Sequence, residues 1–148
     1  MARRPTNHAR HAALSRLHKR TLLPLPQKAV DAMALEYHAA LAALASGQGS
    51  RHGVELLQQL VVIARFIGET SSTRLDPALL EQLTAALQAV LERGTATGEW
   101  LIDAADRALC AALVIEHERQ LRVIPIGSLE KAVDRAKHFA TACRDKEE

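Results

Sequence analysis

The sequence predicts an all-α fold: a helical bundle of about five amphipathic helices, with a basic N-terminal arm or short helix in front of it. Hydrophobic residues make up 48% of the chain but aromatic residues only 3%, so the apolar volume comes from Ala, Leu and Val, a composition that favours helices over strands. Apolar residues also recur at helical spacing in five separate segments. At 148 residues the chain suits one domain, able to bury about two-thirds of its unfolded surface.

The first segment, residues 1–26, is expected to form a basic arm that ends in a proline hinge. Residues 1–30 hold seven bases and no acid (+7), whereas the other 118 residues hold 12 bases and 17 acids (−5), which gives the net charge of +2. A short basic helix is expected from about Asn7 to Lys19. Pro24 and Pro26 keep the residues before them extended, so no helix should cross this point.

The bundle is expected to occupy residues 27–148. Its first two helices are predicted over about 27–45 and 51–67, each with one apolar stripe, and with Gly68 as the end of the second. The third is predicted to start at Pro77, with Asp76 as the N-cap, because proline's missing N–H costs nothing at the first helical position. Gly94 is a suitable C-terminal end for it.

The fourth helix is predicted to open at Thr97 or Gly98 and to continue to about Leu121. Its buried residues are expected to be mainly alanines and leucines: Leu101, Ala104, Ala105, Ala108, Leu109, Ala112, Leu113 and Ile115. This alanine run would let a neighbouring helix come close and could support a homodimer. Pro125 ends the helix, and Ser128 can cap a fifth one. The inner side of that last helix is expected to hold Leu129, Val133, Ala136, Ala140 and Cys143.

The two cysteines, Cys110 and Cys143, both fall at apolar positions of these stripes. They are interpreted as packed thiols in a reducing cytoplasm, with a disulfide as the alternative. No stretch reaches the roughly 18 apolar residues that a membrane span needs, so no membrane partner is expected. The predicted location is therefore cytoplasmic, although an Arg-rich start without acids is also typical of an organelle transit peptide.

No pattern in the chain is typical of an enzyme, and neither a cofactor nor a metal site is expected. His8 and His11 could share a helical face, but the arm offers no Cys, Asp or Glu to complete four zinc ligands. The run 116–118 (Glu-His-Glu) points in three directions round a helix, so these side chains should not converge on one ion. The glycine-rich segment 46–53 could bind an anion at the start of the following helix, or could be an ordinary turn.

The arm is therefore the candidate site. Its guanidinium groups and ammonium group could neutralise phosphates of DNA or RNA. The residues expected to do so are Arg3, Arg4, Arg10, Arg16, Lys19 and Arg20. If five of its bases met phosphates of duplex DNA, log affinity would fall with log salt at a slope of about −4.5. The alternatives are a protein partner, an inert tail, or docking of the arm on its own acidic bundle.

The stretch RPTNHARHAALSRLHKRTLLPLPQ (residues 4–27) resembles the start of small helical proteins of prophages and integrative elements of Gram-negative bacteria, some labelled transcriptional regulators. The resemblance implies a mobile-element context, in which both regulators and inhibitors of host defence are encoded. The expected function is thus a non-enzymatic protein that binds nucleic acid or a nucleoprotein complex, such as an accessory regulator. The alternative is an inhibitor of the anti-CRISPR type that docks on a host defence complex.

Overall fold

The computed structural model describes residues 7–71 and 74–147, and these residues form helices and no strand. The helices are α1 (Asn7–Thr21), α2 (Gln27–Ala45), α3 (Arg51–Thr70), α4 (Pro77–Thr97), α5 (Ala104–Val123) and α6 (Ile126–Glu147). The all-α prediction is confirmed. The described part of the chain has six helices instead of about five, because the basic segment adds α1 to the five of the bundle.

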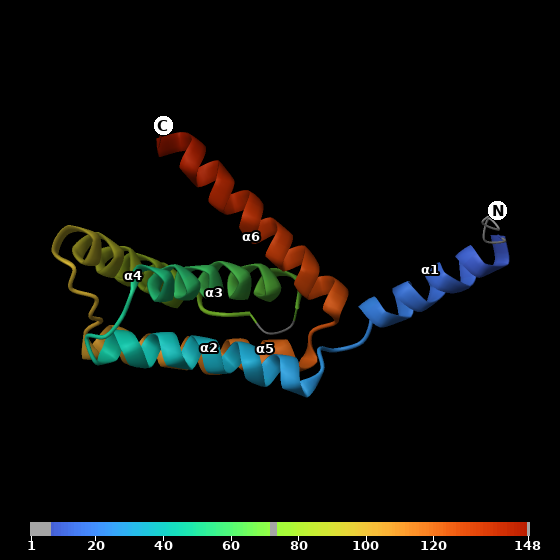
Figure 1. The fold of residues 1–148 in the computed structure, drawn as a ribbon, viewed down its shortest axis with the longest axis horizontal. Helices are drawn as coiled ribbons and strands as arrows, with labels where there is room; N and C mark the ends of the chain where they lie inside the picture. Colours follow the sequence, from blue (N-terminus) through green and yellow to red (C-terminus); the bar gives the residue numbers. More distant parts are fainter. Residues whose placement is uncertain (1–6, 72–73, 148) are drawn as a thin grey trace, which may run out of the picture.

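The bundle has two layers and a helix that leaves them. Figure 1 shows α2 and α5 side by side in one layer, α3 and α4 in the other, and α6 rising from the end of the bundle at which α1 also departs. Contacts agree with this picture, since α2 packs against α5 and α3, α3 also packs against α4 and α6, and α1 meets the rest of the fold at α6.

The core lies between the layers and is built largely from leucines. Leu57 and Leu60 of α3, Leu83 and Leu87 of α4, and Leu113 of α5 are fully buried there. A second, smaller cluster lies under the first turns of α6 and contains Val30, Ile67, Leu121, Ile124, Leu129 and Ala132. The predicted stripes of α2, α3 and α4 thus face the core, while only the first half of α6 does so.

Helix α4 starts as predicted but ends one turn later. The Asp76 carboxylate accepts a hydrogen bond from the Ala78 N–H at 3.0 Å, and Pro77 is the first helical residue. The end lies at Gly98, whose φ of 75° is left-handed, and not at Gly94. Gly94 is instead buried against Trp100, and a Cβ on it would come within 2.2 Å of Trp100 Cε3. Its lack of a side chain makes room for the indole.

The prediction for α5 is wrong at its start and on its buried face. The helix begins at Ala104, with Asp103 as the N-cap accepting from the Asp106 N–H at 2.9 Å. The face turned to the core consists of Cys110, Leu113, Val114, His117, Gln120 and Leu121. The exposed side holds five residues expected to be buried: Ala104, Ala105, Ala108, Ala112 and Ile115. Two polar residues of α5, His117 and Gln120, lie in the core. The predicted buried face is therefore turned relative to the observed one, because the prediction used apolar residues alone.

Further expectations differ in the structure. Helix α6 begins at Ile126, so Ser128 lies inside it and does not cap it. Leu101 precedes α5 and is exposed. Gly68 does not end α3, which continues to Thr70 with Gly68 buried inside it. Cys110 is buried as expected, but Cys143 is exposed. The reason is that α6 is held at Arg135, whose guanidinium lies 4.1 Å from the Phe66 ring centroid and 2.8 Å from Glu69 Oε2. The ring of Phe139 still meets Phe66 edge-on, with 6.3 Å between centroids, but α6 rises away from α3, and Cys143 lies in solvent.

Candidate nucleic-acid interface

Helix α1 is an isolated helix that points away from the bundle. It spans 15 residues, none of which is buried, and Figure 1 shows it projecting beyond the end of α2. Its sequence explains why it forms: alanine and leucine favour helix, and His18, Lys19 and Arg20 stand in the last turn, where cations interact well with the helix dipole. The hinge is non-helical from residue 22 to 26, where the two prolines stand.

The positive charges of α1 are not compensated by the bundle. Four bases of the predicted site lie on this helix, and all are exposed: Arg10, Arg16, Lys19 and Arg20. Within residues 7–71 and 74–147, none of them forms an ion pair. Several bundle arginines do, for example Arg51 with Glu55 at 2.9 Å. The other two predicted site residues, Arg3 and Arg4, lie outside the described residues.

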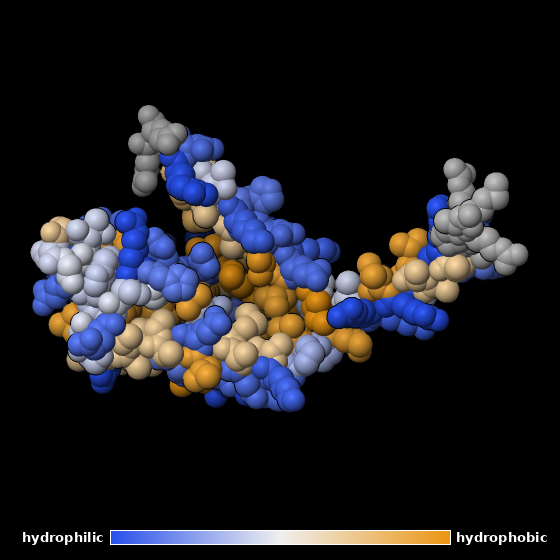
Figure 2. Space-filling model, viewed as in Figure 1, coloured by the Kyte–Doolittle hydropathy of each residue, from blue (hydrophilic) through white to orange (hydrophobic). Residues whose placement is uncertain are grey.

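Helical geometry divides α1 into two sides. Arg16, Lys19 and Arg20 are spaced i, i+3, i+4 and therefore share one face. Leu14 and Leu17 are three residues apart and lie on another side, each with 65% of its surface exposed. Figure 2 shows hydrophilic and hydrophobic residues side by side along this helix. Arg16, Lys19 and Arg20 thus form a cationic face, whereas Leu14 and Leu17 form a narrow apolar edge that also carries Arg10, four residues before Leu14.

The base of the arm is fixed to the start of α6. The Ile126 N–H donates to the Leu23 carbonyl at 2.8 Å, and the backbones at Pro24 and Pro125 pair antiparallel. Gly127 also matters here, because a Cβ on it would lie 3.0 Å from Thr21 Cβ. These contacts hold the end of α1 against α6 and direct the helix outward.

The run of Glu116, His117 and Glu118 falls into three different surroundings. Glu116 pairs with Arg119 at 2.5 Å, and Glu118 pairs with Arg122 at 2.5 Å and lies 3.8 Å from His38 Nε2. His117 is fully buried, and its Nδ1–H donates to Gln120 Oε1 at 3.1 Å. In residues 7–71 and 74–147, no three His, Cys, Asp or Glu side chains come together.

The environment of His117 is unusual for a histidine. Its ring meets Tyr37 edge-on, with 5.6 Å between centroids, and its Nε2 is buried without a hydrogen-bond partner in the described structure. Burial lowers the pKa of His117 to about 4, against a smaller opposite effect of the Gln120 bond. Burial likewise raises the pKa of the nearby Cys110 thiol to about 11. Sequence reasoning missed His117, although its spacing from Cys110, Leu113 and Leu121 continues their stripe.

The glycine-rich segment 46–53 contains the turn between α2 and α3 and the start of α3, and its Ser50 and Arg51 side chains already interact with other groups of the protein. The Ser50 hydroxyl accepts from the Gly53 N–H at 3.1 Å and so caps α3. Arg51, which could have met an anion there, pairs with Glu55. The alternative of an anion site at this helix start therefore gains no support.

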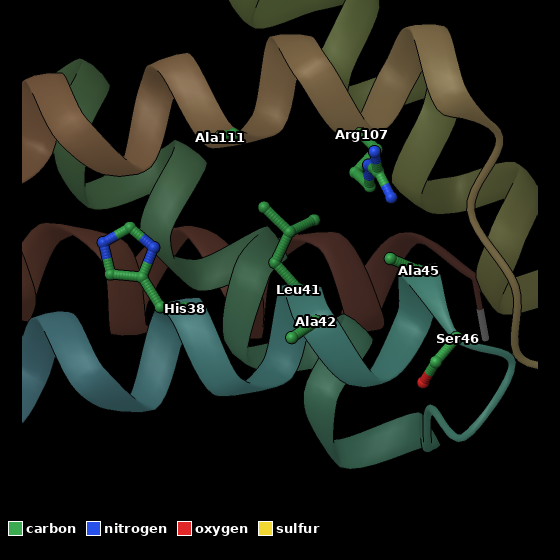
Figure 3. Close-up of a pocket in the computed structure, with 7 residues that line it drawn as sticks. All are labelled: His38, Leu41, Ala42, Ala45, Ser46, Arg107 and Ala111. Atoms are coloured by element: carbon green, nitrogen blue, oxygen red, sulfur yellow. The ribbon is translucent and has the colours of Figure 1, made fainter.

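A groove runs between α2 and α5 on the outer side of that layer (Figure 3). Its volume is about 470 Å³. Most of its lining is apolar and small, and His38 and Arg107 supply its charged or titratable groups: the residues are His38, Leu41, Ala42, Ala45, Ser46, Arg107 and Ala111. The groove is open and shallow enough to hold a side chain or a helix edge.

Comparison with known proteins adds no family. A scan against protein-family models, a search of curated proteins and a search of solved structures each returned no match. None of the helices in the described ranges is long and apolar enough to cross a membrane.

Proposed function

We propose that this is a non-enzymatic mobile-element protein that binds nucleic acid, alone or within a nucleoprotein complex, through the basic arm. One observation carries the proposal: every described cation of the arm is exposed, and none is paired with a carboxylate of its own bundle. A self-docked arm would have paired these groups. Unpaired guanidinium and ammonium groups on one helix are available to phosphates, whose neutralisation releases counterions.

The bases that would contact phosphate are Arg10, Arg16, Lys19 and Arg20 of α1, together with Arg3 and Arg4 before it. Phosphate contacts position a protein but carry no sequence information. The arm should therefore bind many sequences with similar affinity. The bundle keeps an excess of acids, so it should face away from the nucleic acid.

The test is a salt titration of binding, measured by fluorescence anisotropy with duplex DNA, single-stranded DNA and RNA. Replacing Arg16, Lys19 and Arg20 together by Ala should weaken binding and flatten the slope of log affinity against log salt by about 2.7 on duplex DNA. The matched control replaces three exposed bases of the bundle by Ala, namely Arg65, Lys131 and Lys137. If both triple variants bind as the unchanged chain does, the arm is not the interface.

The alternative function, an inhibitor of the anti-CRISPR type, uses the acidic bundle as a protein-docking surface. Capture from a bacterial lysate after nuclease treatment separates the two proposals. A stoichiometric partner that survives nuclease, and is retained by a chain lacking residues 1–24, would favour the inhibitor. Retention that depends on both the nucleic acid and the arm would favour nucleic-acid binding.

A further inference from the structure

The arm carries apolar surface that a nucleic-acid backbone would leave uncovered. Leu14 and Leu17 of α1 are each 65% exposed, and Leu22 and Leu23 of the hinge are 62% and 57% exposed. Four of the nine large exposed hydrophobic residues in the described ranges thus lie within ten residues of one another. Clustered exposed apolar side chains indicate an interaction site for protein.

The stability of α1 also calls for a protein surface. An isolated helix of about 12–15 residues is at the limit of stability in water even with a favourable sequence, since most helix stability in proteins comes from packing. Helix α1 has 15 residues and buries none of them. A contact along the Leu14–Leu17 edge would supply the missing packing.

The groove between α2 and α5 is a largely apolar surface of the bundle that could accept the Leu14–Leu17 edge of α1. Leu41 lies at its floor, and Ala42, Ala45 and Ala111 line it, as Figure 3 shows. Small side chains on two neighbouring helices let a third helix approach closely and place its larger side chains between them. The exposed Ala108 lies one turn from Ala111 on α5 and extends this surface.

We propose that two copies of the chain form a dimer by exchanging arms, with the Leu14–Leu17 edge of each α1 seated in the α2–α5 groove of the other copy. The opposite net charges of the arm and the rest of the chain favour a second copy as the occupant. Residues 1–21 carry six bases and no acid (+6), whereas residues 22–148 carry 13 bases and 17 acids (−4). Arm and bundle therefore attract each other, while two arms side by side would repel.

The geometry of the hinge favours exchange over docking of the arm on its own bundle. The Ile126–Leu23 hydrogen bond and the contact of Thr21 with Gly127 hold the arm at α6. Figure 1 shows α1 directed away from α2, whereas the groove lies along the later half of α2, from His38 to Ser46. A reciprocal exchange closes on itself with twofold symmetry, so it yields a dimer and not a filament.

The dimer can be tested apart from the proposed function, because Leu14 and Leu17 lie on another side of α1 than Arg16, Lys19 and Arg20. Arg10, four residues before Leu14, shares the leucine side and would turn towards the groove in the dimer. With Leu14 and Leu17 in the groove, the face of Arg16, Lys19 and Arg20 stays open to phosphate. The dimer is therefore tested without nucleic acid. Loss of dimerisation and loss of nucleic-acid binding would be separate results.

Sedimentation velocity of the full chain over a range of concentrations tests the apolar edge. The unchanged chain should dimerise, and replacing Leu14 and Leu17 by Gln should raise the dimer dissociation constant by at least about tenfold, because their burial is lost. The matched control puts Gln at Ala9 and Ala12, which are exposed on the other side of the same helix. A chain that stays monomeric throughout, or a dimer unaffected by the leucine changes, would overturn the proposal.

Two variants and a cross-link test the groove. Ala42→Arg should fill it and weaken the dimer by a similar factor, whereas Ala85→Arg, at an exposed position of α4, should not. In a Cys143→Ser background, a chain with Leu17→Cys mixed with a differently tagged chain with Ala42→Cys should form a disulfide between the two chains under mild oxidation. No cross-link between the chains, or equal effects of the two arginines, would show that the arm docks elsewhere.

Discussion

Replacing His117 should remove a specific part of the pH dependence of stability. The imidazole is fully buried, donates from Nδ1 to Gln120 Oε1 at 3.1 Å, and leaves Nε2 without a hydrogen-bond partner in the described structure. Adding a proton at Nε2 would place an unpaired charge in the core. Burial accordingly lowers the pKa of His117 from 6.5 to about 4.

The sign and size of the effect follow from proton linkage. Between pH 6.5 and about 4 the unfolded chain binds a proton at His117 and the folded chain does not, so stability falls as pH drops through this window. Above pH 6.5 the contribution is constant. A pKa difference of one between the unfolded and folded chain corresponds to about 1.4 kcal/mol. The free energy of unfolding therefore falls by about 3 kcal/mol over the whole window, and by about 2 kcal/mol at pH 5. A typical domain has only about 5–15 kcal/mol of stability in total.

The assay compares urea unfolding of the unchanged chain and of His117→Gln between pH 7.5 and pH 4.5. Glutamine does not titrate, so the difference in unfolding free energy between the two proteins should shift by about 2 kcal/mol in favour of the variant by pH 5. His52→Gln, at an exposed position of α3, is the control and should leave the profile unchanged. Parallel profiles for His117→Gln and the unchanged chain would refute the burial argument.

Substitutions at four other positions test the fold. Gly94→Ala should destabilise by about 1–3 kcal/mol and shift the tryptophan fluorescence, because the new Cβ would meet Trp100; unchanged thermal unfolding would contradict that packing. Asp76→Ala should cost about 1 kcal/mol by removing the N-cap of α4, measured by urea unfolding, with an Asn variant retaining most of the stability. Leu87→Ala should cost about 2–5 kcal/mol, and Leu109→Ala clearly less, since Leu87 is fully and Leu109 only partly buried. Equal losses of stability in the two variants would contradict this difference in burial.

The fold class and most helices could be predicted because they depend on local patterns. Asp76 and Pro77 mark the start of α4 through chemistry confined to a few residues, and the stripe of α2 is visible in the order of residues alone. The face of α5 could not be predicted in this way. His117 and Gln120 are buried because they satisfy each other and because the Gln120 amide donates to the Ala64 carbonyl of α3 at 3.3 Å, a partner 56 residues away.

The C-terminal end of α4 likewise could not be predicted from local sequence. The sequence predicts the end of α4 at Gly94 and a possible start of the next helix at Gly98, although either glycine can adopt the left-handed conformation of a helix end. The choice is made by Trp100, which needs the space beside Gly94 and leaves Gly98 as the cap. A contact across a loop thus decides a boundary that local propensity leaves open.

For the candidate site, the sequence predicted the basic helix and its hinge but not what the helix does with its two sides. Charge could be counted from the residues, but the absence of compensating carboxylates around the described bases is a property of the fold, as is the outward direction set at Gly127. An arm that folded back would have neutralised itself and covered Leu14 and Leu17 with the same movement. Because the structure shows both the cations and the leucines exposed, each side of α1 is open to a partner, and we propose phosphates for one side and a second bundle for the other.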